Sequence, residues 1–389
     1  MSSPLSSLKI LDFSTLLPGP FATMMLADMG ADILWVDAVK GNHLNQENAR
    51  SVSMREYLGR SKRSIALDLK RPEAITIVKR LVNEYDIIVE QFRPGVMERL
   101  GLDYKTICKI QPRIIYCSIT GYGQTGPYKD RAGHDINYLA TAGVSSHSGR
   151  KENGPILSGV QIADVAGGSL HAVAGILAAV IQRIQTGEGQ YLDISMTDGS
   201  FALNSIHGAE YLSGGSEPKL ESTLLNGGSF YDYYETKDGR YFSVGSMEPK
   251  FFQQLCKVLE KTGDVKTESG LQSKDVKELK FQIASTFKQK NYKDWCKTFS
   301  AVDACVEPVL TFTEAVHHPQ LKARKMIVDV PADNGSCNKQ IGNPIKFSLS
   351  ETDYRHIGVP PGAHSKEILL EIGFTESELK ILFDQGIVS

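Results

Sequence analysis

The sequence predicts an α/β fold in which a large domain built on a parallel sheet is followed by a small α+β domain. In the first half of the chain, short segments rich in branched apolar residues alternate with helical segments, the pattern of a parallel sheet. Beyond residue 230, Tyr-rich pairs and amphipathic helices replace this alternation. With 389 residues, of which 41% are hydrophobic, the chain is long enough for two packed units.

The elements of the large domain follow one another as strand and helix. A strand is expected at 8–13, and a Pro-Gly-Pro turn at 18–20 leads into a helix over 21–29. The same patterns predict strands at 33–37, 87–90, 114–118 and 191–195, and helices at 73–83, 164–183 and 198–212. The Ala- and Gly-rich helix over 164–183 has apolar residues on every face, so we expect it to be buried on all sides.

The second half of the chain begins with a Gly-, Ser- and Glu-rich stretch, which predicts a linker. After it, 230–235 and 241–244 flank Lys-Asp-Gly-Arg at 237–240, which predicts a β-hairpin. Helices are expected over 250–259 and 276–289, and a last helix over 377–383 could rejoin the first domain. The predicted organisation is a large domain over 1–212, a linker over 213–229, a small domain over 230–314, and a return linker with C-terminal completion of the large domain over 315–389.

Composition excludes several classes of function. The 43 Lys+Arg and 45 Asp+Glu give a net charge of -2, so no global field attracts nucleic acid or an anionic membrane. The N-terminus lacks a secretory signal, and the longest apolar run, 172–181, is about half the ~20 residues of a membrane span, so we expect a cytoplasmic protein. The six cysteines contain no C-x-x-C pair, which favours reduced thiols over a metal site or a disulfide framework.

A glycine motif after the fourth expected strand formally matches G-x-G-x-x-G at 121–126. A dinucleotide fingerprint requires a helix N-terminus directly behind it, whereas Pro127, Tyr128 and Lys129 follow here. The sequence therefore disfavours nicotinamide and flavin cofactors, and it contains no phosphate-binding loop of the ATPase type.

Three side chains are candidates for acid–base chemistry. His134 follows the glycine motif, in a loop of the kind that carries active sites at the carboxyl ends of parallel strands, although a lone histidine is more often structural. Asp164 begins the apolar helix, where it is either a helix cap or a carboxylate tuned as base or nucleophile by apolar neighbours. Glu248 begins a helix of the second domain and is either a solvated acid or a residue that closes over a cleft.

Basic residues recur near the loops of the first domain. They are Lys62, Arg63, Arg93, Arg99 and Arg131. Each of them can be ordinary surface charge. Alternatively, several of them together could bind a phosphorylated ligand, because guanidinium groups match phosphate oxygens in geometry and charge.

Several motifs, which occur in order along the chain, indicate a known family to which these candidate residues can be compared. The sequence resembles the class III coenzyme A transferase superfamily, and specifically its α-methylacyl-CoA racemase branch, over nearly its whole length. The resemblance is carried by Leu-Pro-Gly-Pro-Phe at 17–21, Ala-Asp-Met-Gly-Ala at 27–31, Lys-Arg-Ser-Ile-Ala-Leu-Asp-Leu-Lys at 62–70, Phe-Arg-Pro-Gly-Val at 92–96, the segment 121–127, Gly-His-Asp-Ile-Asn-Tyr at 133–138, Ala-Asp-Val-Ala-Gly-Gly at 163–168, Thr-Gly-Glu-Gly-Gln at 186–190 and Glu-Pro-Lys-Phe at 248–251.

The resemblance implies a homodimer of two interlocked subunits, each with a Rossmann-like large domain that the C-terminus completes. The active site would combine the large domain of one subunit with the small domain of the other. An acyl-CoA thioester would be the substrate, with coenzyme A as part of it and with no separate cofactor and no metal. The residues implied to bind coenzyme A are Ala66, Leu67, Asp68, Leu69, Arg93, Arg99, Gly133, Asp135, Asn137 and Lys40.

The branch of the superfamily sets the chemistry that the resemblance implies. Racemases use the aspartate matching Asp164 as a base and add the histidine matching His134, held by the glutamate matching Glu248, as a second acid/base. Inversion of a stereocentre by proton transfer requires such a pair, because a proton leaves one face and another arrives on the opposite face. The enolate oxygen also needs oriented donors, for which the start of the Asp164 helix is a candidate.

Two alternatives remain open at this point. Transferases of the superfamily use the same aspartate as a nucleophile and generally lack the histidine, and they move coenzyme A from an acyl-CoA to a free carboxylic acid. The other alternative is a non-catalytic CoA-binding subunit, against which the retained His134, Asp164 and Glu248 argue. Because His134 is present, the resemblance favours a racemase that interconverts the stereoisomers of a 2-methylacyl-CoA.

Two positions depart from the racemase pattern. Racemases commonly have an arginine directly after the aspartate matching Asp37, where this chain has Ala38 and Val39 before Lys40. Ahead of Asp164, a racemase-like Asn-Leu-Leu is replaced by Val-Gln-Ile at 160–162. Lys40 is the residue that could restore the lost phosphate contact.

Overall fold

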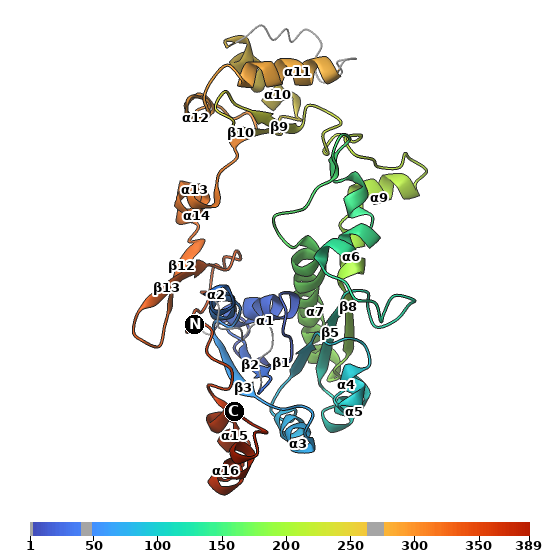
Figure 1. Cartoon of the computed structure of the whole chain (residues 1–389), viewed down its shortest axis with the longest axis vertical. Helices are drawn as coiled ribbons and strands as arrows, with labels where there is room; N and C mark the ends of the chain where they lie inside the picture. Colours follow the sequence, from blue (N-terminus) through green and yellow to red (C-terminus); the bar gives the residue numbers. More distant parts are fainter. Residues whose placement is uncertain (1–2, 40–48, 263–275) are drawn as a thin grey trace. The chain divides into compact units, whose positions relative to one another are not determined.

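The computed structural model describes residues 3–39, 49–262 and 276–389 (Figure 1). The chain divides into two compact units. Unit 1 comprises 1–142, 158–203 and 322–389, and unit 2 comprises 143–157 and 204–321. Residues 143–157 therefore group with unit 2, although the sequence analysis counts them in the first part of the large domain.

Unit 1 is built on a six-stranded parallel sheet, which confirms the predicted α/β fold. The strands lie in the order β3-β2-β1-β4-β5-β8, with bounds β1 Lys9–Asp12, β2 Asp32–Asp37, β3 Lys62–Ala66, β4 Ile87–Glu90, β5 Ile115–Thr120 and β8 Tyr191–Ser195. The edge strand β3 was not predicted; it pairs in parallel with β2 from Ile33↔Lys62 to Asp37↔Ala66. Two adjacent basic residues, Lys62 and Arg63, begin β3, and Ile65 is its one branched apolar residue, so its sequence lacks the apolar run that indicates a strand.

Helices cover both faces of this sheet. Residues of α3, α5, α15 and α16 pack with Leu11, Ile88 and Tyr116 into one hydrophobic core. Helices α1 and α7 pack against the sheet and against each other (Figure 1). The helices of unit 1 are α1 Pro18–Asp28, α2 Ala49–Leu58, α3 Pro72–Leu81, α4 Val96–Arg99, α5 Tyr104–Ile110, α6 Asp135–Thr141, η3 Ala163–Leu170, α7 His171–Thr186, α8 Met196–Ala202, α15 Ser365–Glu371 and α16 Glu376–Asp384, and a hairpin is formed by β12 Ile327–Pro331 and β13 Cys337–Ile341.

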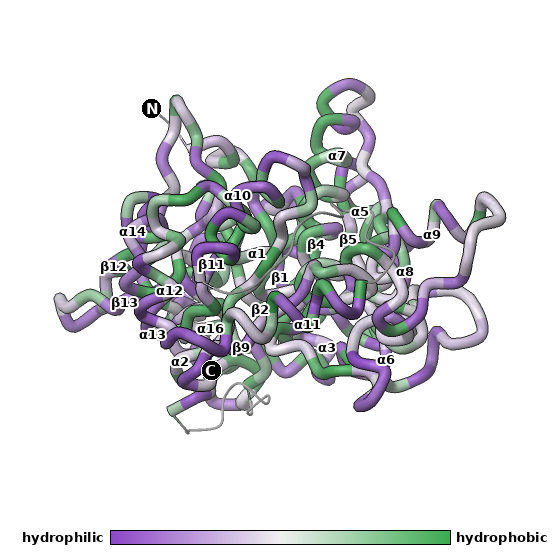
Figure 2. Tube along the Cα trace, turned by 90° about the horizontal axis from the view of Figure 1, so that it is seen from above, coloured by the Kyte–Doolittle hydropathy of each residue, from purple (hydrophilic) through white to green (hydrophobic). Residues whose placement is uncertain are grey.

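The helix expected to be buried on all sides is buried on one face only. Ala172, Val173 and Ile176 of α7 are buried, whereas Ile181 is 59% and Ile184 is 77% exposed. The prediction is therefore wrong for the single chain, although much of α7 is hydrophobic (Figure 2). Residues 163–186 are long and apolar enough to cross a membrane by length and composition, yet a large part of this segment is buried inside the protein. Helices in protein cores meet the same length and composition criteria.

Unit 2 contains the predicted hairpin, with β9 Asp232–Glu235 antiparallel to β10 Tyr241–Val244. With β11 Val306–Pro308 these strands form a sheet in the order β11-β10-β9. Its core is aromatic and includes Phe242, Phe287, Trp295 and Phe299. The remaining elements of this part of the chain are η2 Val144–His147, β6 Gly149–Arg150, β7 Gly154–Pro155, α9 Ser205–Leu212, α10 Pro249–Glu260, α11 Val276–Phe287, α12 Tyr292–Phe299, α13 Phe312–His317 and α14 Pro319–Ala323.

The helix expected over 198–212 is divided. Helix α8 ends at Ala202, α9 begins at Ser205, and the boundary between the two units falls between Leu203 and Asn204. The sequence did not predict this break, because its helical periodicity continues across residues 203 and 204.

Candidate active site

The loops that follow the carboxyl ends of the strands carry the predicted site residues of unit 1. Ala66 ends β3, Arg93 follows β4, and His134 lies in the segment after β5. In open parallel sheets, ligands bind at this edge, where the strand order changes direction. Here the order changes between β1 and β4, and Gln91 accepts a hydrogen bond from the Gly19 backbone across that point (3.2 Å).

His134 is positioned by a tight turn at the start of α6. Its backbone N–H donates to Asn137 Oδ1 (3.0 Å), and the Tyr138 hydroxyl donates to the Gly133 carbonyl (2.5 Å). The Tyr138 ring packs against two glycines, since a Cβ at Gly121 or Gly133 would come within 2.4 or 2.6 Å of it. The His134 side chain is exposed, so it is accessible to a substrate.

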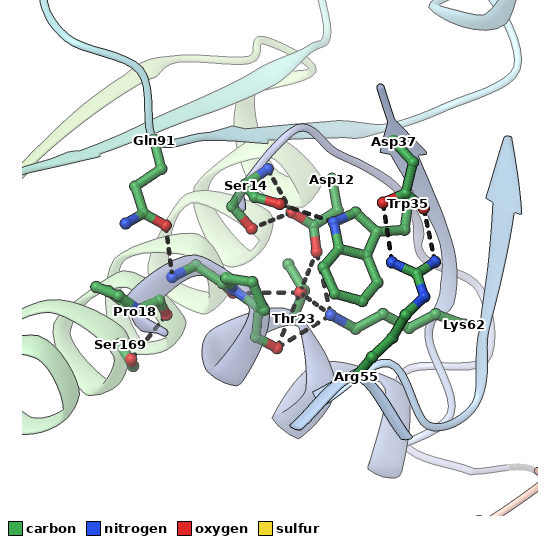
Figure 3. Close-up of polar contacts among 12 residues, drawn as sticks. Asp12, Ser14, Pro18, Thr23, Trp35, Asp37, Arg55, Lys62, Gln91 and Ser169 are labelled. Atoms are coloured by element: carbon green, nitrogen blue, oxygen red, sulfur yellow. Dashed lines mark hydrogen bonds and ion pairs between the residues drawn. The ribbon is translucent and has the colours of Figure 1, made fainter. Parts of the chain in front are cut away.

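Asp164 lies in the first turn of η3, a π-helical segment that runs directly into α7. Such segments are often found at functional sites. Glycines hold η3 against α8, because a Cβ at Gly199 would lie 2.2 Å from the Gly167 carbonyl oxygen. The Ser169 hydroxyl donates to the carbonyls of Pro18 (2.7 Å) and Asp164 (3.1 Å), which fixes the turn to the start of α1 (Figure 3).

The environment of Asp164 raises its pKa to about 6. Burial is the main cause, and the negative charge of Asp135 adds to it, whereas His134 lowers the pKa. Asp135 is also a direct structural partner, because its Oδ1 accepts the backbone N–H of Asp164 (3.0 Å). The structure thus brings together His134, Asp135 and Asp164, and it gives Asp164 a pKa suited to a base near neutral pH.

Two backbone amides at the start of the Asp164 helix, which was the predicted source of donors for an enolate oxygen, already have acceptors. The Asp164 amide donates to Asp135, and the Val165 amide donates to the Gln161 carbonyl (3.0 Å). These two amides are therefore engaged, and the source of donors for an enolate oxygen stays a prediction.

Replacing Asp135 by asparagine should lower the pKa of Asp164 below about 6, because a negative charge is removed while an amide oxygen still accepts the Asp164 N–H. Asp164 would then stay ionised to lower pH, so the acid limb of the pH–rate profile should shift to lower pH. Asp130→Asn, which removes an exposed carboxylate from the preceding loop, serves as the control. An acid limb that does not move in Asp135→Asn would contradict this account.

Comparisons with known proteins agree on the family. A sequence profile of CoA-transferase family III matches residues 5–365. The chain belongs to CoA-transferase family III. It is 36% identical to the human alpha-methylacyl-CoA racemase over 99% of this chain and 97% of the relative, and 32% identical to the human succinyl-CoA:glutarate CoA-transferase over 99% and 90%. The crystal structure of a CAIB/BAIF family protein from Brucella suis superposes with a TM-score of 0.83 at 28% identity, covering 96% of this chain and all of that chain.

Members of CoA-transferase family III act on acyl-CoA thioesters. The described residues predicted to bind coenzyme A end β3 or follow the carboxyl ends of β3, β4 and β5. The segment Ala66 to Leu69 is tied to the C-terminus, because Asp68 N–H donates to the Ile387 carbonyl (2.9 Å). Arg93 and Arg99 are exposed and form no ion pair within 4.0 Å in the described part of the chain. Gly133, Asp135 and Asn137 build the turn that holds His134. Lys40 lies outside the described residues.

Lys62 is neither surface charge nor a phosphate ligand. Its Nζ is buried and donates to Asp12 Oδ2 (3.1 Å), Thr23 Oγ1 (2.7 Å) and the Pro20 carbonyl (3.0 Å) (Figure 3). Arg63 pairs with Glu371 (2.9 Å). For Lys62, both predictions, surface charge and a phosphate site, are therefore wrong. Lys62 instead holds the first turns of α1 in place.

Glu90, the last residue of β4, is a candidate functional residue that was not predicted from the sequence. Its side chain lines a cavity of about 230 Å³ together with Arg93, Ser118 and Tyr191. Glu90 is 3% exposed, and burial raises its pKa to about 7, although hydrogen bonds from Ser118 and the Phe92 amide lower it. A glutamate that ends an apolar strand was the available signal, because charged residues are rarely buried without a purpose.

Glu248 precedes α10 in unit 2 and is exposed. Its role as the partner of His134 stays a prediction. Its backbone conformation is extended, so it occupies the cap position of α10 without a side-chain cap bond.

Proposed function

We propose that this member of CoA-transferase family III is an acyl-CoA racemase that interconverts (R)- and (S)-2-methylacyl-CoA. The observation that carries the proposal is the pairing of two acid/base groups in unit 1, because Asp135, the chain neighbour of His134, accepts the backbone N–H of Asp164 (3.0 Å). A transferase that works through an aspartyl intermediate has no need of this histidine. The 36% identity to a racemase over nearly the whole chain supports the same reaction.

The reaction would run through an enolate. Ionised Asp164 removes the α-proton from one face of the thioester, the electron pair moves onto the thioester oxygen, and protonated His134 returns a proton to the opposite face. In the reverse direction the two groups exchange roles. A pKa of about 6 leaves Asp164 mostly ionised at pH 7 and still basic enough to accept a proton.

A CoA-transferase is the second candidate, and the 32% identity to the succinyl-CoA:glutarate enzyme favours it. In that reaction, the Asp164 carboxylate would attack the thioester carbonyl, forming a mixed anhydride and releasing the CoA thiolate. The CoA thiolate would then attack the aspartyl carbonyl, forming an aspartyl-CoA thioester and releasing the first carboxylic acid. The acceptor carboxylate would attack this thioester, giving a second mixed anhydride and CoA thiolate. Attack of the thiolate on the acyl carbonyl of that anhydride would form the new acyl-CoA and regenerate the Asp164 carboxylate.

Nuclear magnetic resonance in deuterated water separates the two reactions. A racemase should exchange the α-proton of a 2-methylacyl-CoA for deuterium and erase its stereochemical purity, with no new acyl-CoA when free carboxylic acids are added. An unchanged α-proton together with a new acyl-CoA, and an Asp164 adduct trapped by hydroxylamine, would establish the transferase instead.

His134→Gln tests the two-base arrangement. With Asp164 alone, the variant should still exchange the α-proton of one stereoisomer but should lose inversion by about 10²- to 10⁴-fold, the usual contribution of one acid/base group. His171→Gln, which changes an exposed histidine on α7, is the matched control. Inversion at the wild-type rate in His134→Gln would remove His134 from the mechanism.

We also propose that the protein is a cytoplasmic homodimer. The exposed isoleucines of α7, Ile181 and Ile184, supply an apolar face that a second copy could cover. Light scattering should give twice the chain mass of 42.8 kDa, and Ile181→Glu/Ile184→Glu should shift the protein toward monomer. Ile381→Glu, at an exposed apolar position of α16, should leave the mass unchanged. A wild-type monomer would refute the dimer.

A further inference from the structure

A second cavity of unit 1, of about 500 Å³, is strongly basic. It lies between the end of α14 and the segment that follows β13. Three cationic side chains, Arg324, Lys325 and Lys346, line it, and Glu351 is the one acid among its lining residues. The cavity therefore carries an excess of positive charge.

The three cationic groups of this cavity form no ion pair with the described residues, although Glu351 lies in the same lining. In the described part of the chain, none of the three forms an ion pair within 4.0 Å, whereas the nearby Lys339 pairs with Asp329 (2.9 Å). Lys346 Nζ donates to a neutral group, the Asn343 carbonyl (2.9 Å). Burial and the charges of Arg324 and Lys325 lower the pKa of Lys346, so the groups repel one another. A bound anion would relieve this repulsion.

The walls of the cavity suit an organic phosphate. Phe347 and Tyr354 supply aromatic surface, and Ser350 and Thr352 supply hydroxyl groups. Tyr354 is held in place, since its hydroxyl accepts the Asn343 N–H (2.8 Å) and the Arg60 guanidinium lies 5.1 Å from its ring centroid. Guanidinium and ammonium groups bind phosphate oxygens through charge-assisted hydrogen bonds.

The position of the cavity separates it from the candidate active site. Asp353, beside Tyr354, donates its N–H to the carbonyl of Asp28, the last residue of α1 (2.8 Å). Arg355 donates to the carbonyls of Ala31 (3.0 Å) and Ser61 (2.6 Å), which directly precede β2 and β3. This wall therefore lies at the amino ends of the strands, whereas His134 and Arg93 follow their carboxyl ends.

We propose that this cavity is a binding site for a phosphate-bearing small molecule, separate from the acyl-CoA site. The recognising groups are Arg324, Lys325 and Lys346, and the aromatic wall receives the organic part of the ligand. The site does not depend on whether the enzyme is a racemase or a transferase.

Calorimetric titration of the full chain with inorganic pyrophosphate tests the site. The wild-type protein should bind saturably and more weakly at higher salt. Arg324→Gln/Lys346→Gln should weaken binding by about a hundredfold, since each lost charge-assisted hydrogen bond costs roughly tenfold. Lys339→Gln/Lys380→Gln removes the same charge from exposed positions of unit 1 and should leave binding unchanged. Absence of saturable binding, or equal binding by both double variants, would overturn the proposal.

Two further experiments test whether the cavity binds the phosphates of the acyl-CoA substrate and whether the loss of binding is due to misfolding. Arg324→Lys/Lys346→Arg keeps both positive charges and should still bind pyrophosphate. Loss of pyrophosphate binding in this variant would show that binding does not depend on the positive charge of the cavity. The Arg324→Gln/Lys346→Gln variant should keep the wild-type KM for an acyl-CoA while losing pyrophosphate binding. A KM that rises in parallel would make the cavity the nucleotide subsite of the substrate and would refute a separate site.

Discussion

Asp164→Asn should lower kcat for acyl-CoA turnover by about 10²- to 10⁴-fold while leaving acyl-CoA binding nearly intact. The amide cannot accept the α-proton, but it has the size of the carboxylate and preserves the π-helical turn that Ser169 fixes to Pro18. Steady-state rates from both stereoisomers and calorimetric binding of the acyl-CoA would measure the two effects separately. The loss should be similar in both directions, because Asp164 acts as base in one and as acid in the other.

Asp198→Asn is the matched control for this variant. Asp198 is an exposed acid of α8, the helix against which the Asp164 segment packs, so the control removes a charge from the same neighbourhood. Its kcat should stay within about twofold of wild type, as for a substitution outside the reacting groups. Activity of Asp164→Asn at the wild-type level would exclude Asp164 from catalysis, both as a base and as a nucleophile.

Lys62→Met should lower the free energy of unfolding by about 3–5 kcal/mol, since it leaves Asp12 as a buried charge without its cation. Asp12 would keep the hydrogen bonds from the Ser14 and Thr23 hydroxyls, which do not replace a positive charge. The Trp35 ring, whose centroid lies 4.6 Å from Lys62 Nζ, would also lose a cation–π contact. Urea unfolding followed by circular dichroism measures the change.

Two further variants make this result specific to the buried pair. Lys70→Met removes an exposed lysine just beyond β3 and should change stability by less than about 0.5 kcal/mol. Asp12→Asn/Lys62→Met should recover part of the loss, because no unpaired charge is left. A Lys62→Met variant as stable as the wild type would show that the pair does not hold the start of α1.

The parallel sheet and the hairpin were predictable because both rest on local patterns. Segments rich in branched apolar residues, such as Ile87–Glu90, favour the strand conformation at any position in a sheet. The Lys-Asp-Gly-Arg turn at 237–240 connects two strands that are adjacent in the sequence. The strand Lys62–Ala66 was not predicted because the burial of its side chains depends on tertiary contacts. Lys62 is buried because it pairs with Asp12, which lies 50 residues away in the chain. The division of the expected helix over 198–212 depends likewise on which unit each half joins.

The family, the parallel sheet and the candidate residues His134 and Asp164 could be predicted without a structure, because each rests on local motifs. Only the tertiary structure showed that Asp135 accepts the Asp164 amide, that one face of α7 stays exposed, and that Glu90 lies buried beside a cavity. The physical reason is that a pKa and a buried charge depend on groups brought together in space, such as Asp135 and Asp164, which are 29 residues apart in the chain. Spacing along the sequence specifies which groups are present, and packing decides which of them meet.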